Sequence, residues 1–228
     1  MTEEKRELAE LLIENRLFLY TLLHRVFGRE PDQQQLEILT EEHTGEAFGL
    51  LSETEGDPLD RAAGFLRGIR EKLKDPAFTE TVRGEYTRLF LGPASLPAPP
   101  WESVYEGTDA VLFQESTLEV RDFYRRFGFL PESYPRVADD SLALELAFMA
   151  ALAGRMEEAF RLGDDGRLQE TMAGSREFLE KHLLKWIPKF TERMAGKAEG
   201  VLYPPMCLVL ESYLKRDAGI LKEIAGWI

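Results

Sequence analysis

A proline-rich stretch at residues 91–100 constrains this chain more than any other feature. It contains Pro93, Pro97, Pro99 and Pro100. Each proline fixes φ, removes an amide donor and pushes the residue before it towards an extended conformation. The sequence therefore predicts an extended, non-helical connection here, with a helix ending before it and separate elements following it.

Outside this stretch the chain has the pattern of α-helices. Apolar residues recur at steps of three and four along most of the sequence, and strict apolar/polar alternation is not found. Asp32, Asp57-Pro58 and Asp75-Pro76 have the form of helix starts, with the acid as N-cap. We predict an all-α fold: a single helical-bundle domain spanning residues 1–228, with roughly ten helices.

Residues 130–140 contain two further prolines and precede the most apolar helical segment. This stretch is predicted to be a hinge between helical lobes. Helix exchange at such a hinge would convert the expected monomer into a domain-swapped dimer.

Large apolar residues flank the proline-rich stretch. Leu89 and Phe90 precede it, and Trp101 and Tyr105 follow it. Two interpretations stand side by side. The segment is a structural corner, since large aromatic residues are usually buried, or it is the rigid wall of a groove that binds an extended or helical peptide.

The composition is strongly acidic. Lysine and arginine number 28 against 41 acids, which gives a net charge of -13. Nucleic-acid binding needs a positive surface, so the charge argues against a nucleic-acid partner. It favours cationic partners or plain solubility.

The residue types that carry out catalysis do not form a recognisable motif. The histidines, His24, His43 and His182, are far apart and have no metal-ligand spacing, and Cys207 has no local catalytic signature. No phosphate-binding glycine motif is present. The sequence therefore predicts a binding protein, not an enzyme, with no metal and no cofactor.

One pair of acids stands out. Asp139 and Asp140 follow the predicted hinge and precede the most apolar helix. Helix capping explains at least one of them, and their charge makes both candidates for binding a cation. The single cysteine, the acidic N-terminal segment and the lack of a long apolar run predict a cytoplasmic protein without a membrane span.

Three patches together resemble the TorD/DmsD family of cytosolic redox-enzyme maturation chaperones, which is related to the NarJ group. The first patch is YTRLFLGP at 86–93 with PPWESVY at 99–105. The second is ADD at 138–140 with EL and FM at 145–149, and the third is the HL and W pattern within 178–188. Their order and the chain length also fit the family.

The resemblance implies a helical chaperone without catalysis. Such chaperones bind the twin-arginine signal peptide, or the apo-form, of a molybdopterin oxidoreductase catalytic subunit until its cofactor is inserted, and so delay export. By this resemblance Leu89, Phe90, Trp101 and Tyr105 would receive the apolar part of the peptide. Glu102, Asp139 and Asp140 would face its arginines, to which carboxylates make strong charge-assisted hydrogen bonds.

One position departs from the family pattern. Family members often have Asp-His at the hinge, and here Ser141 follows Asp140, so no role of that histidine is carried over. The alternatives are a NarJ-like assembly factor for a subunit without an export signal, or a protein that binds or hydrolyses a guanine nucleotide. Dimethyl sulfoxide, trimethylamine N-oxide, nitrate and selenate reductases all fit as clients.

Overall fold

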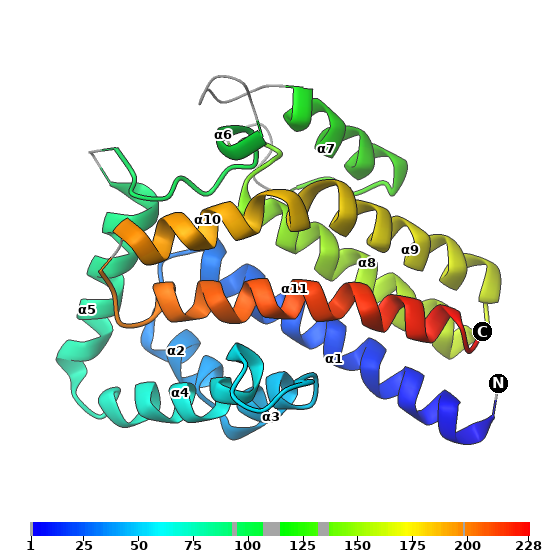
Figure 1. Ribbon diagram of the computed structural model, residues 1–228, viewed down its shortest axis with the longest axis horizontal. Helices are drawn as coiled ribbons and strands as arrows, with labels where there is room; N and C mark the ends of the chain where they lie inside the picture. The colour runs from blue at the N-terminus through cyan, green and yellow to red at the C-terminus, as the bar shows by residue number, and fades with distance from the viewer. Residues whose placement is uncertain (1, 93–94, 107–114, 132–136, 198) are drawn as a thin grey trace. The chain divides into compact units, whose positions relative to one another are not determined.

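The computed structural model describes residues 2–92, 95–106, 115–131, 137–197 and 199–228. Within these ranges the chain is helical and has no β-strand, which confirms the predicted all-α fold (Figure 1). The α-helices are α1 (Glu3–Gly28), α2 (Gln33–Leu39), α3 (Glu42–Gly49), α4 (Pro58–Lys72), α5 (Pro76–Tyr86), α6 (Ser103–Glu106), α7 (Glu115–Arg126), α8 (Leu142–Leu162), α9 (Asp165–Phe178), α10 (Leu184–Lys197) and α11 (Tyr203–Ala225). Two π-helical segments, Thr87–Leu91 and Leu179–Leu183, continue α5 and α9.

The predicted aspartate caps lie where the sequence places them. The carboxylate of Asp32 accepts from the backbone N–H of Gln35 at the start of α2. Asp57 and Asp75 cap α4 and α5 in the same way, each followed by a proline in the first turn. These local signals were sufficient because a cap and its partner lie within a few residues of each other.

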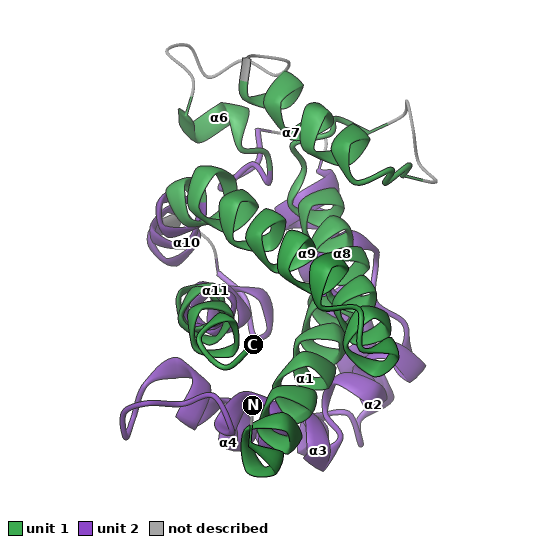
Figure 2. Ribbon diagram, turned by 90° about the vertical axis from the view of Figure 1, so that its right-hand side faces the viewer, with its two compact units in different colours: residues 1–24, 101–186, 214–228 green, residues 25–100, 187–213 purple. Residues whose placement is uncertain are grey.

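The chain forms two compact units, each assembled from distant segments (Figure 2). Unit 1 consists of residues 1–24, 101–186 and 214–228, and unit 2 of residues 25–100 and 187–213. The single domain over 1–228 stays a prediction. Much of the predicted hinge at 130–140 lies outside the described residues, since the structure describes 130–131 and 137–140 but not 132–136.

The core of unit 1 is built around α8 and α9. A tight turn at Gly163, whose φ of 68° is in the left-handed region, ends α8 and returns the chain along it as α9. Phe148 of α8 packs edge-on against Phe178 of α9, with 4.8 Å between ring centroids. Tyr124 of α7 contacts Phe148 at 4.9 Å. The aromatic contacts therefore fix α7 on the α8–α9 pair.

A buried ion pair joins α1 to α11 within unit 1. The Nε of Arg16 lies 2.5 Å from a carboxylate oxygen of Asp217, and both side chains are fully buried. The hydroxyl of Tyr20 donates to the other oxygen of Asp217 at 2.6 Å. Such a pair is stable only when its remaining hydrogen-bonding groups are satisfied, as they are here by Tyr20.

In unit 2, Glu85 at the end of α5 caps a helix that starts more than a hundred residues later. Its buried carboxylate accepts from the backbone N–H groups of Val201 and Tyr203, both at 2.8 Å, and of Leu202 at 3.2 Å. These amides open α11, where a helix leaves its N–H groups unpaired and favours a negative charge. Only glycine fits at position 200, because a Cβ there would lie 2.1 Å from Oε1 of Glu85.

Candidate functional site

The segment Trp101–Glu106, which follows the proline-rich stretch, is attached to the residues just before α8 by backbone and side-chain hydrogen bonds. Trp101 and Ser141 form an isolated antiparallel bridge. The N–H of Glu102 donates to the carbonyl oxygen of Asp140 at 3.0 Å, and the N–H of Ser103 donates to its carboxylate at 2.9 Å. The WESVY part of the first sequence patch and the ADD patch therefore meet in unit 1.

The capping role predicted for Asp139 and Asp140 is wrong. The N-cap of α8 is Ser141, whose hydroxyl accepts from the N–H of Leu144. Asp139 is instead paired with the guanidinium of Arg121 on α7, at 2.7 Å, and its carbonyl oxygen accepts from the Tyr124 hydroxyl. Ser141 thus performs the capping, which leaves both acids for tertiary contacts.

A buried polar cluster lies behind this attachment. Glu102 is 2% exposed and faces His182, which is fully buried, with Nδ1 of the imidazole 2.9 Å from Oε2. Glu145 of α8 is also fully buried and accepts from the indole N–H of Trp186 at 3.0 Å. Sequence analysis gave neither Glu145 nor His182 a role at the site, since their partners lie 41 and 80 residues away.

Burial dominates the electrostatics of the cluster. It raises the pKa of Glu145 well above the ordinary glutamate value, and the negative charge of Glu102 raises it further. Burial also raises the pKa of the Tyr124 hydroxyl well above its ordinary value, with Glu145 and Asp139 contributing. Both shifts follow from the cost of placing a further negative charge where water is excluded.

Of the seven residues predicted to bind peptide, only Trp101 and Tyr105 keep part of their surface exposed. Tyr105 stacks on Trp186, with 5.6 Å between ring centroids and an interplanar angle of 26°. Glu102, Asp139 and Asp140 lie close to them in unit 1 but are buried.

Leu89 and Phe90 belong to unit 2 and are also buried. Phe90 packs in an aromatic cluster with Tyr86 and Tyr203, each at 5.0 Å between ring centroids. These two residues and the three acids are therefore not accessible to a peptide in the arrangement seen here. Their role in peptide binding stays a prediction.

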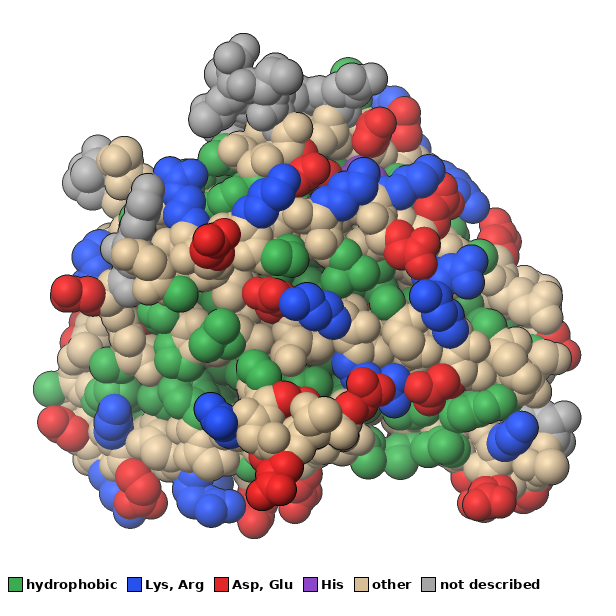
Figure 3. Space-filling model, in the orientation of Figure 1, with side chains coloured by type: hydrophobic (Ala, Val, Ile, Leu, Met, Phe, Trp, Pro, Cys, Tyr) green, Lys and Arg blue, Asp and Glu red, His purple; other side chains and the backbone are tan. Residues whose placement is uncertain are grey.

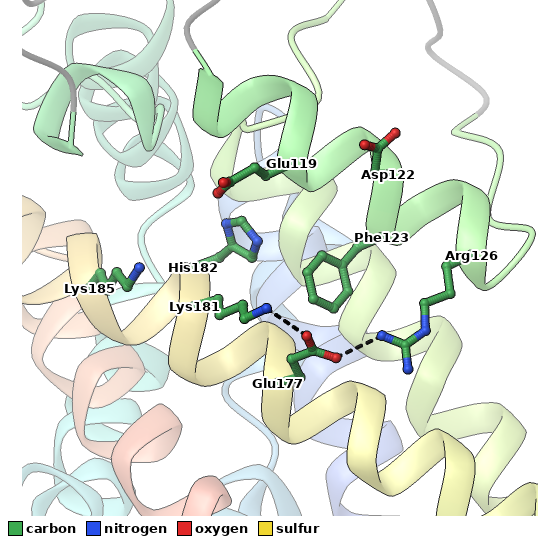
Figure 4. Close-up of a pocket in the computed structure, with 8 residues that line it drawn as sticks. All are labelled: Glu119, Asp122, Phe123, Arg126, Glu177, Lys181, His182 and Lys185. Carbon is green, nitrogen blue, oxygen red and sulfur yellow. Dashed lines mark hydrogen bonds and ion pairs between the residues drawn. The ribbon is translucent and has the colours of Figure 1, made fainter.

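A cavity of about 420 Å³ opens beside the polar cluster, between α7 and the end of α9 (Figure 4). Glu177 projects into it and pairs with Lys181 and Arg126, each at 2.7 Å, and these two cations hold the pKa of Glu177 below its ordinary value. The lining side chains are Glu119, Asp122, Phe123, Arg126, Glu177, Lys181, His182 and Lys185. The wall is balanced in charge, so the cavity does not select one sign of ligand.

Charges of both signs are also interspersed over the face drawn in Figure 3, with apolar side chains between them. Recognition of a cation on this face would depend on individual carboxylates more than on one acidic patch. Among the described residues, no group of three or more His, Cys, Asp or Glu side chains is arranged to hold a metal ion. The described helices also include none that is both long and apolar enough to cross a membrane.

Comparison with known proteins decides the family. Residues 57–192 match the profile of the family described as nitrate reductase delta subunit. The chain belongs to this family. The matched region contains the proline-rich stretch and the whole polar cluster described above, from Glu102 to Trp186.

Some relatives of this chain are chaperones by name. The chaperone protein TorD of Vibrio parahaemolyticus serotype O3:K6 is 24% identical over 210 residues, which cover 91% of this chain and 95% of that protein. The Tat proofreading chaperone DmsD of Salmonella typhi is 33% identical over 113 residues, about half of each chain. These matches confirm the predicted resemblance to the TorD/DmsD family.

A solved structure of a redox enzyme maturation protein from Archaeoglobus fulgidus is also similar. It shares 18% identity with this chain at a TM-score of 0.46, and the match covers 94% of this chain and 96% of the other.

Proposed function

We propose that this protein is a cytoplasmic chaperone for a molybdopterin oxidoreductase. It binds the twin-arginine signal peptide of the catalytic subunit, or its apo-form, assists cofactor insertion and delays export. The observation that carries the proposal is the similarity to the chaperone protein TorD of Vibrio parahaemolyticus, which extends over 91% of this chain. The role is one of binding and release without catalysis.

Trp101 and Tyr105 are the best candidates for contact with the apolar part of the peptide. Both are half-buried and lie on the segment that the polar cluster holds in place. Partly exposed aromatic side chains on a fixed backbone supply large contact area at a low cost in conformational entropy. Leu89 and Phe90 would contact a peptide only after a rearrangement that exposes them.

Asp139 is the acid best suited to accept a peptide arginine. Its present partner, Arg121, is itself a guanidinium whose side chain is 29% exposed. An incoming arginine could take that position without changing the charge or the fork-shaped donor geometry around the carboxylate. Glu102 and Asp140 bond to His182 and to a backbone N–H, and neither partner resembles a guanidinium.

Calorimetric titration with three synthetic peptides tests the proposal. One carries the twin arginines and an apolar segment, one has both arginines replaced by lysine, and one has both replaced by alanine. We expect the order arginine, lysine, alanine, because lysine keeps the charge but loses the bidentate fork. Asp139→Asn should reduce the difference between the arginine and alanine peptides, and Asp122→Asn, an exposed acid on α7, is the matched control. Equal affinity for all three peptides would reject recognition of the arginines.

A second candidate function, that of an assembly factor, is supported by the description of the matching family. The family that matches residues 57–192 is described as nitrate reductase delta subunit, which favours an assembly factor for a subunit without an export signal. Co-purification from the host separates the two, because the partner recovered either carries a twin-arginine segment or lacks one.

A further inference from the structure

The buried cluster contains more carboxylate oxygens than hydrogen-bond donors among the described residues. Glu102, Asp140 and Glu145 are 2%, 0% and 0% exposed. Among the described residues, the donors to these acids are Nδ1 of His182 to Glu102, the Ser103 N–H to one oxygen of Asp140, and the indole N–H of Trp186 to Oε2 of Glu145. Three buried acids therefore share three donors, and a carboxylate offers two acceptor oxygens.

Two carboxylate oxygens are left over. Oε1 of Glu145 and Oδ1 of Asp140 are buried and have no hydrogen-bond partner among the described groups. An ionised oxygen without a donor is costly where water is excluded. A proton on Glu145 removes that cost at Glu145, because Glu145 lies within hydrogen-bonding reach of Glu102 and would donate to it.

The surroundings of Glu145 favour the protonated form. Glu102 and Asp140 face it with negative charge, and both raise its pKa in addition to burial, while the Trp186 N–H opposes them. The Tyr124 hydroxyl of α7 interacts with Glu145, and Arg121 of the same helix is paired with Asp139. On α1, His24 bonds to the carbonyl oxygen of Ala143, and beyond Glu102 lies His182 of the π-helical segment.

The proton on Glu145 affects the position of the Trp101–Glu106 segment. Glu102 belongs to the Trp101–Glu106 segment, whose backbone is attached to Asp140 by the N–H groups of Glu102 and Ser103. If Glu145 ionises, its contact with Glu102 becomes a repulsion between two buried carboxylates, which cannot both remain charged cheaply. The repulsion is relieved when Glu102 moves outward, and Trp101 and Tyr105 move with it.

We propose that Glu145 is a positioning residue that holds the Trp101–Glu106 segment in its binding arrangement only while its own carboxyl carries a proton. The held arrangement is favoured at low pH and is lost as pH rises through the raised pKa of Glu145 in the folded protein. The direction of this pH dependence follows from linkage, since the held state binds one more proton than the released state. The inference rests on the proposed function in one respect only, namely that the segment binds the twin-arginine peptide.

The Trp186 indole N–H reports directly on Glu145, because it donates to that carboxylate. In a ¹H–¹⁵N spectrum we expect its resonance to titrate with a midpoint above that of an ordinary glutamate, together with the amides of Glu102 and Ser103. Glu145→Gln keeps the shape of the protonated acid but cannot ionise, so the Trp186 resonance should become insensitive to pH. The matched control is Glu177→Gln, a carboxylate of the neighbouring cavity, which should leave the titration unchanged.

A second arm measures affinity for the twin-arginine peptide over the same pH range. Wild-type affinity should fall by up to about tenfold per pH unit above the midpoint, and Glu145→Gln should show no such fall. A Trp186 resonance that is flat in the wild type, or that still titrates in Glu145→Gln, overturns the inference. If no peptide binds at any pH, the proposed function fails while the spectra still decide the role of Glu145.

Discussion

We predict that the buried carboxylate of Glu85 stabilises the junction between α5 and α11 in unit 2. It accepts from three backbone N–H groups at 2.8–3.2 Å while only 3% exposed. In Glu85→Gln one oxygen becomes an amide donor that faces other donors, so at least one buried N–H loses its acceptor, at about 1–3 kcal/mol. Loss of the negative charge at a helix N-terminus adds about 0.3–1 kcal/mol.

We therefore expect Glu85→Gln to lower the free energy of unfolding by about 1.3–4 kcal/mol, combining the lost acceptor and the lost charge. For a chain of this size that corresponds to roughly 3–16 °C in Tm. Urea and thermal unfolding followed by circular dichroism measure it. The matched control is Glu80→Gln on the same helix, where an exposed pair with Arg83 contributes little to stability. A loss below 0.5 kcal/mol in Glu85→Gln, similar to the control, would refute the capping role.

Three further outcomes follow from the same structure. Gly200→Ala should destabilise the protein strongly, since its Cβ would lie 2.1 Å from Oε1 of Glu85, and unfolding curves should show a smaller effect in a Glu85→Ala background. Asp217→Asn should cost about 3–5 kcal/mol in urea unfolding by breaking the buried pair with Arg16, and replacing both partners by apolar residues should recover much of the loss. Trp101→Ala should weaken peptide binding in titrations, with a loss of stability below the roughly 3–5 kcal/mol of a fully buried tryptophan. If the loss of stability fully accounts for the weaker peptide binding, Trp101 contributes to the core alone.

The helical fold was predictable because its signals are local. Asp32, Asp57 and Asp75 each cap the helix that the sequence places after them, and the donor lies two or three residues away. The same rule failed at α8, where three consecutive polar residues compete for one cap position. Backbone geometry selects Ser141 there, and the sequence pattern alone does not distinguish it from Asp140.

The polar cluster could not be predicted, because each of its bonds joins residues that are far apart in sequence. Glu102 and His182 are separated by 80 residues, Glu145 and Trp186 by 41. Charge suggests that acids are exposed and available to a cation. Burial reverses this inference, since a buried acid must already have a partner or a proton.

A long and unusual sequence motif is therefore not by itself a binding surface. In the stretch from Glu85 to Tyr105, Glu85 caps α11 and Phe90 packs on Tyr203, while Glu102 bonds to His182. Each of these side chains is accounted for by packing or hydrogen bonding within its own unit. Trp101 and Tyr105 are only partly buried and lie on a segment whose backbone is fixed, so substitutions at these two positions are the ones that can separate recognition from folding.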